Sequence, residues 1–108
     1  MRGCALRFYM HENQRHRGAP LHEWLLDHAR RHGIPGGSAF RAVTGFGRHG
    51  VVSQQHFFEL AGQQTMLVEF IVPAAEADGL LAMVREEGAA LFYTRTDIEF
   101  GLTAPMES

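Results

Sequence analysis

The residues best suited to chemistry in this sequence are Gly45, Phe46, Gly47, Arg48 and His49, which form one continuous run. Glycine lets the backbone approach a bound molecule closely, and the guanidinium of arginine presents a fork of donors to phosphate or carboxylate. The run therefore predicts contact with an anionic small ligand. A Gly-x-Gly pattern after a strand is also typical of a simple turn, and that interpretation stays open.

The seven histidines offer a second chemistry, because neutral imidazole binds divalent metals. His49 and His56 lie in the segment that follows the first glycine, and they form an alternative metal site. His28 and His32 have the i, i+4 spacing that can place two imidazoles on one ion. Since no His-Glu-x-x-His pattern joins them, we interpret both as solvated residues of a helix face, with His32 complementing the helix dipole.

Catalysis has little support in the sequence. Ser38 and Ser53 lack a Gly-x-Ser-x-Gly context, and Cys4 has no activating group close to it in the sequence. The carboxylates of one predicted helix are typical of a solvated face; they are Glu76, Asp78, Glu86 and Glu87. We therefore predict that the protein is not an enzyme.

Composition and charge narrow the remaining classes. A chain of 108 residues, of which 45% are hydrophobic, fits a single domain over residues 1–108. Residues 1–50 hold eight arginines and three acidic residues, whereas residues 51–108 hold two arginines and nine acidic residues. Both halves belong to one small domain with a net charge of -2, so we expect complementary faces and no nucleic-acid binding.

The cellular location is predicted from segments that the sequence lacks. No apolar run approaches the roughly 20 residues that span a bilayer, and Arg7 stands where a signal peptide needs its apolar stretch. The single cysteine, Cys4, cannot form an internal disulfide. We therefore expect a cytoplasmic protein that is not inserted in a membrane.

We expect two β-α-β units to hold the candidate ligand and metal residues in place. Four stretches alternate in the way that is typical of half-buried strands, and two stretches have helical spacing after a proline. The predicted strands are 4–10, 38–44, 66–72 and 92–100; the first helix is 20–32, and the second begins at Pro73 and is capped by Gly88.

With right-handed crossovers this order gives an α+β, ferredoxin-like β-α-β-β-α-β fold, in which two helices cover one face of a four-stranded antiparallel sheet. The strand over 66–72 is apolar on both faces, and two helices cannot bury both of them, so we expect oligomerisation through the open face. The last strand has Phe92, Thr94, Thr96, Ile98 and Phe100 on one face and Tyr93, Arg95, Asp97 and Glu99 on the other, so that one side is core and the other meets solvent or a neighbour.

The connection from Gly45 to Gln64 is too long for a hairpin turn, and long loops in compact domains are usually functional. We expect an arm over residues 47–63 with a mobile tip at residues 53–55. The rest of the arm is predicted to form a β-ribbon that covers its large apolar side chains, namely Val51, Val52, Phe57, Phe58 and Leu60.

Three segments, residues 20–26, 33–37 and 41–50, together with Arg15-His16-Arg17-Gly18, give the chain its clearest likeness. The sequence resembles the PII-like family known as domain of unknown function 190. That resemblance implies a ferredoxin-like homotrimer with a long loop after the second strand and with ligands in the clefts between subunits. In nitrogen-regulatory PII proteins a similar Gly-Phe-Gly-Arg lies beside bound adenine nucleotide, although residues 88–92 here lack the lysine found in those proteins.

The resemblance implies a signalling protein that senses a small ligand, an adenine nucleotide or an anion, and acts on a cytosolic or membrane partner protein. Two alternatives share the fold. One is a copper-linked CutA-like trimer, with a divalent metal at His49 and His56. The other is a cofactor-free dimeric oxygenase, in which Trp24 would act with His22 or His28. We interpret Trp24 as a core residue, since it lies on the apolar stripe of its helix.

Overall fold

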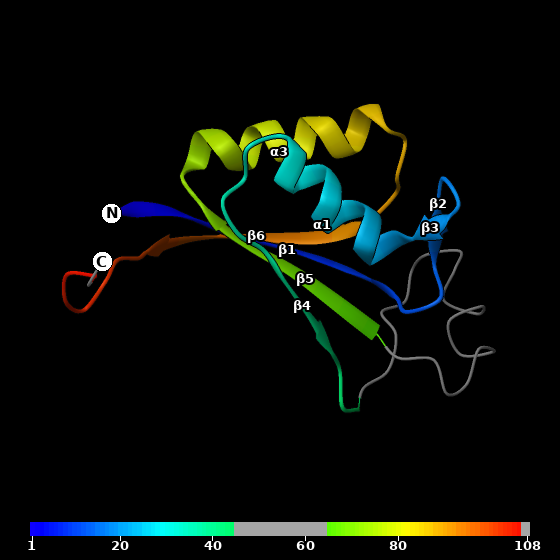
Figure 1. Ribbon diagram of the computed structural model, residues 1–108, viewed down its shortest axis with the longest axis horizontal. Helices are drawn as coiled ribbons and strands as arrows, with labels where there is room; N and C mark the ends of the chain where they lie inside the picture. The colour runs from blue at the N-terminus through cyan, green and yellow to red at the C-terminus, as the bar shows by residue number, and fades with distance from the viewer. Residues whose placement is uncertain (45–64, 107–108) are drawn as a thin grey trace.

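The computed structural model describes residues 1–44 and 65–106, and these form a sheet with both helices on one side (Figure 1). The predicted ligand residues, His56 and the predicted arm lie outside the described residues. The elements are β1 (Arg2–His11), β2 (Arg15–His16), β3 (Ala19–Pro20), α1 (Leu21–Arg31), β4 (Ser38–Arg41), β5 (Thr65–Val72), α3 (Ala74–Glu86) and β6 (Phe92–Glu99).

The main sheet has the strand order β4-β5-β1-β6, and every neighbouring pair is antiparallel. The first strand of the chain therefore lies at the centre, between the strands that flank the second helix. Because this order is the ferredoxin-like one, the predicted fold class is confirmed. Neither helix among the described residues is long and apolar enough to cross a membrane.

The region between β1 and α1 contains two short strands, although we predicted no strand there. β2 and β3 pair there as a small hairpin, whose turn has a positive φ at both Arg17 (51°) and Gly18 (80°). Such a turn matches the twist of the flanking strands. Pro20 ends β3 and caps α1 instead of occupying the first helical turn. β4 is also shorter than predicted, since it ends at Arg41.

The core lies between the helices and one face of the sheet. On β1 every second side chain is buried there, and Trp24 of α1 is only 8% exposed, as predicted for a core residue. The buried side chains on this side include Leu6, Phe8, Val68, Phe70, Leu25, Ala29, Leu80 and Val84. None of the described polar or charged residues is fully buried, so this layer is held together by apolar packing.

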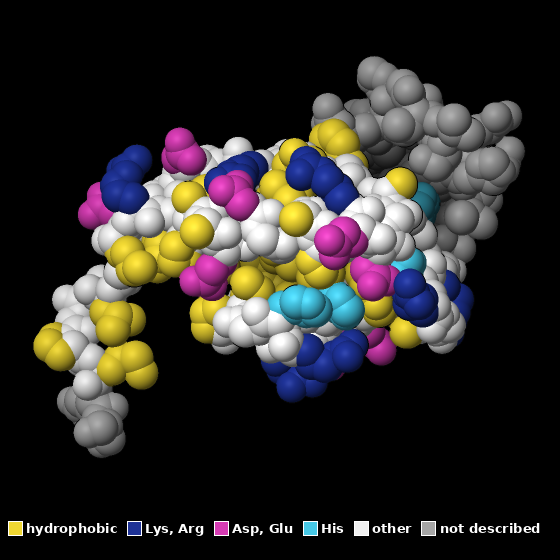
Figure 2. Space-filling view, turned by 90° about the horizontal axis from the view of Figure 1, so that it is seen from above, with side chains coloured by type: hydrophobic (Ala, Val, Ile, Leu, Met, Phe, Trp, Pro, Cys, Tyr) yellow, Lys and Arg dark blue, Asp and Glu magenta, His cyan; other side chains and the backbone are white. Residues whose placement is uncertain are grey.

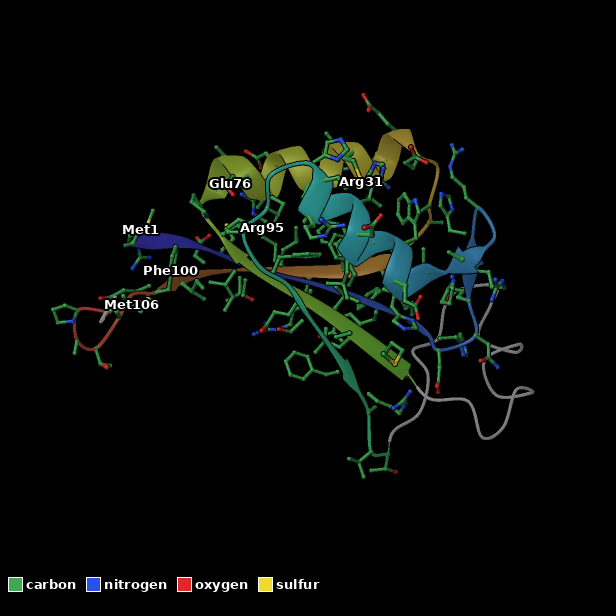
Figure 3. All side chains as sticks on the ribbon, in the orientation of Figure 1. Met1, Arg31, Glu76, Arg95, Phe100 and Met106 are labelled. Carbon is green, nitrogen blue, oxygen red and sulfur yellow. The ribbon has the colours of Figure 1, made fainter. Side chains whose placement is uncertain are left out.

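β6 presents its polar face to the helices. Arg95 is paired with the buried Leu6 of β1, and directly paired residues share a face of a sheet. Its guanidinium nitrogen Nη1 lies 2.6 Å from Oδ1 of Asp78 on α3, and Figure 3 shows Arg95 below that helix. A long side chain on an edge strand can reach the helix margin, which leaves the apolar face of β6 on the open side of the sheet.

Candidate functional site

The structure shows the residues on either side of segment 45–64, which contains the predicted ligand residues. Arg41 ends β4, Thr65 begins β5, and the amide of Ala42 donates to the carbonyl oxygen of Thr65 at 2.9 Å. The two strands that carry residues 45–64 are therefore adjacent where that segment leaves and re-enters the sheet. Gly45, Phe46, Gly47, Arg48 and His49 lie outside the described residues, and their role stays a prediction.

An open depression lies next to this point. It has a volume of about 490 Å³ and brings together the turn after β1, the hairpin, the first turn of α1 and the end of β4. Its lining residues are Glu12, Asn13, Gln14, Arg15, Pro20, His22, Glu23 and Arg41. Because Arg41 is the last residue of the strand that leads to the predicted ligand segment, we take this depression as the candidate site.

Arg41 is one of four charged residues that line the depression, with Glu12, Arg15 and Glu23. Its Nη2 donates to Oε2 of Glu12 at 2.8 Å, and this hydrogen bond raises the pKa of Arg41 above its ordinary value. The guanidinium side chain is still 55% exposed. One side of the fork is therefore held by Glu12, while the exposed part can meet an anion.

The first turn of α1 adds polar groups to the same wall. Pro20 gives the helix no side-chain cap, and the amide of Leu21 instead donates to the carbonyl oxygen of Gln14 at 2.7 Å. The Nδ1 atom of His22 is buried, with no hydrogen-bond partner among the described residues. A helix start favours negative charge, so this wall suits an anionic or polar group.

Sequence reasoning assigned no role to the residues of this depression, except for His22 as an alternative catalytic group. They come from four elements, and only the folded sheet brings them together. The one signal that could have marked the region is Arg15-His16-Arg17-Gly18, a basic run ending in glycine, which is typical of a turn that presents charged side chains.

A row of neighbouring rings lies on the other side of the hairpin. The ring centroids of His16 and Trp24 are 4.3 Å apart, those of Trp24 and His28 are 5.0 Å apart, and those of His28 and His32 are 4.5 Å apart. Figure 2 shows histidine side chains gathered beside arginines on the helical side of the molecule.

His28 is therefore not the solvated residue that we predicted. Its Nδ1 atom is buried and has no hydrogen-bond partner within residues 1–44 and 65–106. Burial, together with the nearby His32, lowers the pKa of His28 below 6.5. The prediction failed because the spacing of His28 and Trp24 along α1 places the imidazole flat against the indole, at an interplanar angle of 19°.

Glu87 ties the hairpin to the end of α3. Its Oε1 accepts a hydrogen bond from Nε of Arg17 at 2.7 Å and lies 3.4 Å from Nε2 of His16. The hydrogen bond from His16, followed by that from Arg17, lowers the pKa of Glu87. The predicted solvated face of carboxylates is thus wrong for Glu87, whose side chain is only 22% exposed. Asp78 is paired with Arg95 but is 71% exposed, as predicted.

The described ranges 1–44 and 65–106 offer no additional residues in support of the metal alternative or the oxygenase alternative. No group of three or more His, Cys, Asp or Glu side chains there could hold a metal ion. The metal alternative thus depends on His49 and His56, which lie outside those ranges. Of the oxygenase residues, His28 stacks on a buried Trp24, while His22 lines the depression.

The open face of the sheet carries an apolar row that crosses all four strands. The registers place Phe40 of β4 beside Leu67 of β5, Leu67 beside Tyr9 of β1, and Tyr9 beside Phe92 of β6. Phe40 is 50% exposed and Phe92 is 47% exposed, and the rings of Tyr9 and Phe92 have centroids 5.5 Å apart.

An ion pair stands next to this row. Nε of Arg7 on β1 donates to Oε2 of Glu69 on β5 at 2.8 Å, and the two side chains are 34% and 22% exposed. Beyond the pair, Ile71 is 44% exposed on the same face. The pair also joins a residue of the arginine-rich half of the sequence to one of the acid-rich half. The open face is therefore a large, mainly apolar surface.

Two solved structures that share this fold are PII-like proteins. TTHA0516 from Thermus thermophilus, described as a PII-like signaling protein, has a TM-score of 0.59 at 19% identity, covering 90% of this chain and 87% of that one. CPII from Thiomonas intermedia K12, a nitrogen regulatory PII-like protein bound to ADP, AMP and bicarbonate, has a TM-score of 0.57 at 19% identity, covering 96% and 98%. At these identities the likeness shows a shared PII-like fold.

Sequence comparison gives the family. Residues 3–100 match DUF190, described as "Uncharacterized ACR, COG1993", and the chain belongs to this family. The UPF0166 protein of Aquifex aeolicus (strain VF5) is 30% identical over 66 residues, covering 61% of this chain and 63% of that relative. The match thus spans less than two thirds of the relative's length. The resemblance stated from residues 20–26, 33–37 and 41–50 is confirmed.

Proposed function

We propose that this protein is a non-enzymatic, PII-like regulatory protein that assembles as a homotrimer. In this proposal it binds a small ligand, an adenine nucleotide or an anion, at the clefts between subunits. Occupancy would be passed to a partner protein through residues 47–63. The open face of the sheet is the observation that carries the proposal.

The open face supports assembly because several of its exposed side chains are large and apolar. Phe40, Ile71 and Phe92 are each more than 40% exposed on one face of one sheet. Burying an apolar side chain of this size contributes about 1.5–3 kcal/mol, so a second and third copy would gain substantially by covering the row. Three sheets meeting through their open faces is the arrangement that we propose.

The depression supports a ligand at the base of the arm. Arg41 and the first turn of α1 offer donors in this depression, and Arg41 precedes the predicted contacts Gly45, Gly47 and Arg48 in the sequence. CPII, which shares the fold, was solved with ADP, AMP and bicarbonate, and these compounds carry the negative charge that such donors favour. The absence of lysine from this chain makes arginine the source of every fixed cation in the proposed site.

Assembly is tested by sedimentation equilibrium of the purified full chain at micromolar concentration. We expect three times the mass of the 12.1 kDa chain. A monomer would overturn the proposed assembly, and a dimer would favour the oxygenase alternative.

Ligand binding is tested separately by a thermal-shift screen of adenine nucleotides, bicarbonate, phosphate and divalent metals. A compound that binds only the folded protein must raise its melting temperature. We expect a rise with a nucleotide or an anion, and the rise should be reduced in Arg48→Ala. A rise with a metal alone, lost in His49→Ala or His56→Ala, would favour the CutA-like alternative instead.

A further inference from the structure

The proposed function does not use residues 101–106, which we call the C-terminal tail. The tail follows β6 and has no regular secondary structure. Figure 1 shows it leaving the sheet at the end where the N-terminus lies, and Figure 2 shows hydrophobic side chains on it, away from the main body. Among the described residues, it makes no hydrogen bond to the rest of the chain. The tail therefore projects from the single chain.

The composition of the tail is that of a contact surface. None of its side chains is ionisable, and its two largest side chains, Leu102 and Met106, are 68% and 77% exposed. One exposed leucine is ordinary, but apolar side chains grouped on an uncharged, projecting segment are typical of an interaction site. The tail thus has apolar surface that the rest of the described chain does not cover.

The base of the tail is held on the open face of the sheet. The amide of Phe100 donates to the carbonyl oxygen of Met1 at 2.8 Å, and Figure 3 shows both residues at one end of the molecule, with Met106. A Cβ at Gly3 would lie 2.6 Å from Cε1 of Phe100, so the ring occupies the space that a side chain would need. Gly3 alternates with the buried Cys4, which places the ring of Phe100 on the open face.

The open face has a second apolar region at this end. The strand registers place Ile71 of β5 beside Ala5 of β1, and Ile98 of β6 beside Gly3. Ile71 is 44% exposed, and Ile98 and Phe100 are partly exposed. The ion pair of Arg7 and Glu69 separates this region from the apolar row described above. We call the region the end patch; it consists of the large side chains of Ile71, Ile98 and Phe100 around the small residues Gly3 and Ala5.

We propose that the C-terminal tail of one copy docks on the end patch of the next copy. Each subunit then gives one tail and receives one, an exchange that closes in a symmetric ring of three. The inference rests on the proposed homotrimer and adds a second contact to it. The apolar rows meet where the sheets face one another, and the tails cover the ends of the same faces.

The dimensions of the chain allow this exchange. An extended chain advances by at most about 3.6 Å per residue, so the six residues of the tail reach about 20 Å beyond Phe100. Sheets that pack face to face lie about 10 Å apart. The tail is therefore long enough to reach the sheet of a neighbouring copy. To cover its own end patch it would have to reverse direction directly after Phe100, which belongs to that patch.

The chemistry of the two surfaces also matches. Neither the tail nor the end patch carries a charge, so their contact would bury no ion without a partner. Both offer large aliphatic side chains, whose burial is favourable. A second copy of this chain supplies both surfaces at once, and the occupant of the end patch is therefore the tail of another subunit.

The test compares two substitutions in the full chain. Leu102→Asp places a carboxylate on a side chain that the proposal buries between copies, and Thr103→Asp places the same charge on the polar residue beside it. We expect Leu102→Asp to raise the dissociation constant of the assembly by about tenfold or more in sedimentation over a dilution series, and Thr103→Asp by less than about threefold. Circular dichroism should be unchanged in both, because the tail lies outside the core.

Photo-cross-linking identifies the surface that the tail meets. Benzoylphenylalanine replaces Leu102, and ordinary and nitrogen-15-labelled chains are refolded together, so that links between copies carry both labels. We expect mixed-label links from position 102 to peptides that contain Ile71 or Ile98. Links within one copy only would mean that the tail folds back onto its own sheet, which would overturn the exchange.

The sedimentation results separate this inference from the proposed function. A trimeric parent in which Leu102→Asp and Thr103→Asp have equal effects would overturn the exchange of tails and leave the trimer standing. A monomeric parent would overturn both.

Discussion

The same strands form both faces of the sheet, but the two faces differ in what covers them. On the helix side, β1 and β5 place Phe8, Val68 and Phe70 under α1 and α3, and each is at most 1% exposed. On the open side the same strands carry Tyr9, Leu67 and the pair of Arg7 and Glu69. The helix side is complete within one chain, whereas the open side resembles half of an interface. Substitutions at neighbouring positions should therefore have separate consequences.

The largest effect is expected from Phe70→Asp. Phe70 is 1% exposed and its ring lies edge-on to Phe8, with centroids 6.2 Å apart. An unpaired carboxylate there should cost more than about 4 kcal/mol of folding free energy, which is enough to unfold a small domain. Circular dichroism should show loss of the fold. A folded variant would mean that the helix side is not the core.

Ile71→Asp tests the other face one residue along the same strand. Ile71 is 44% exposed, so the single chain can hydrate the new carboxylate and keep its fold. In an assembly the charge would be buried, and a cost of about 1.4 kcal/mol already weakens association about tenfold. We expect a folded monomer in sedimentation. An assembly as stable as that of the parent would place the interface elsewhere.

A smaller effect on the helix side is expected from Gly37→Ala. A Cβ at this position would lie 2.5 Å from Cε1 of Phe70 and 3.0 Å from Cδ2 of Leu26. The overpacking should cost about 1–3 kcal/mol, measured by urea unfolding. Gly36→Ala is the control, since a Cβ there meets nothing within 4 Å. Equal stabilities of the two variants would contradict close packing above Phe70.

The smallest expected effect concerns the stacked rings at the rim of the helix side. The positive charge of His32 is one reason for the lowered pKa of His28, so His32→Gln should raise that pKa toward 6.5. A histidine with a lowered pKa stabilises the fold above pH 6.5, and this stabilisation is lost as the pH falls through the folded pKa. His32→Gln should make that loss smaller, because the difference between the unfolded and folded pKa values narrows. Nuclear magnetic resonance titration of the His28 ring measures the shift, and an unchanged pKa would show that His32 does not contribute to it.

The sequence predicted the helix side well, because its signals are periodic. Cys4, Leu6, Phe8 and Met10 alternate in β1, and the spacing of Leu21, Trp24, Leu25 and Ala29 marks the buried side of α1. The two glycines that end the helices, Gly33 and Gly88, have the positive φ that a helix end of this kind requires. Local patterns therefore carried most of the fold.

The remaining features depend on contacts between distant residues. The strands of the hairpin are too short for any periodicity, and the orientation of β6 was left open because both of its faces are mixed. The depression joins Glu12 to Arg41 and Arg15, which no spacing in the sequence relates. The stack on Trp24 likewise required the hairpin to fold back onto α1. Tertiary contacts of this kind leave no local signature.

The hydrogen bond between Ala42 and Thr65 has a mechanical consequence for residues 45–64. It holds both ends of that segment side by side, at the end of an antiparallel pair of strands. A partner that pulls on the segment would load this pair from its open end, so that its hydrogen bonds break one after another, beginning with Ala42 and Thr65 and continuing toward Ser38. Successive breakage needs far less force than breaking all of the bonds together, so the junction would yield while the central strands stay paired.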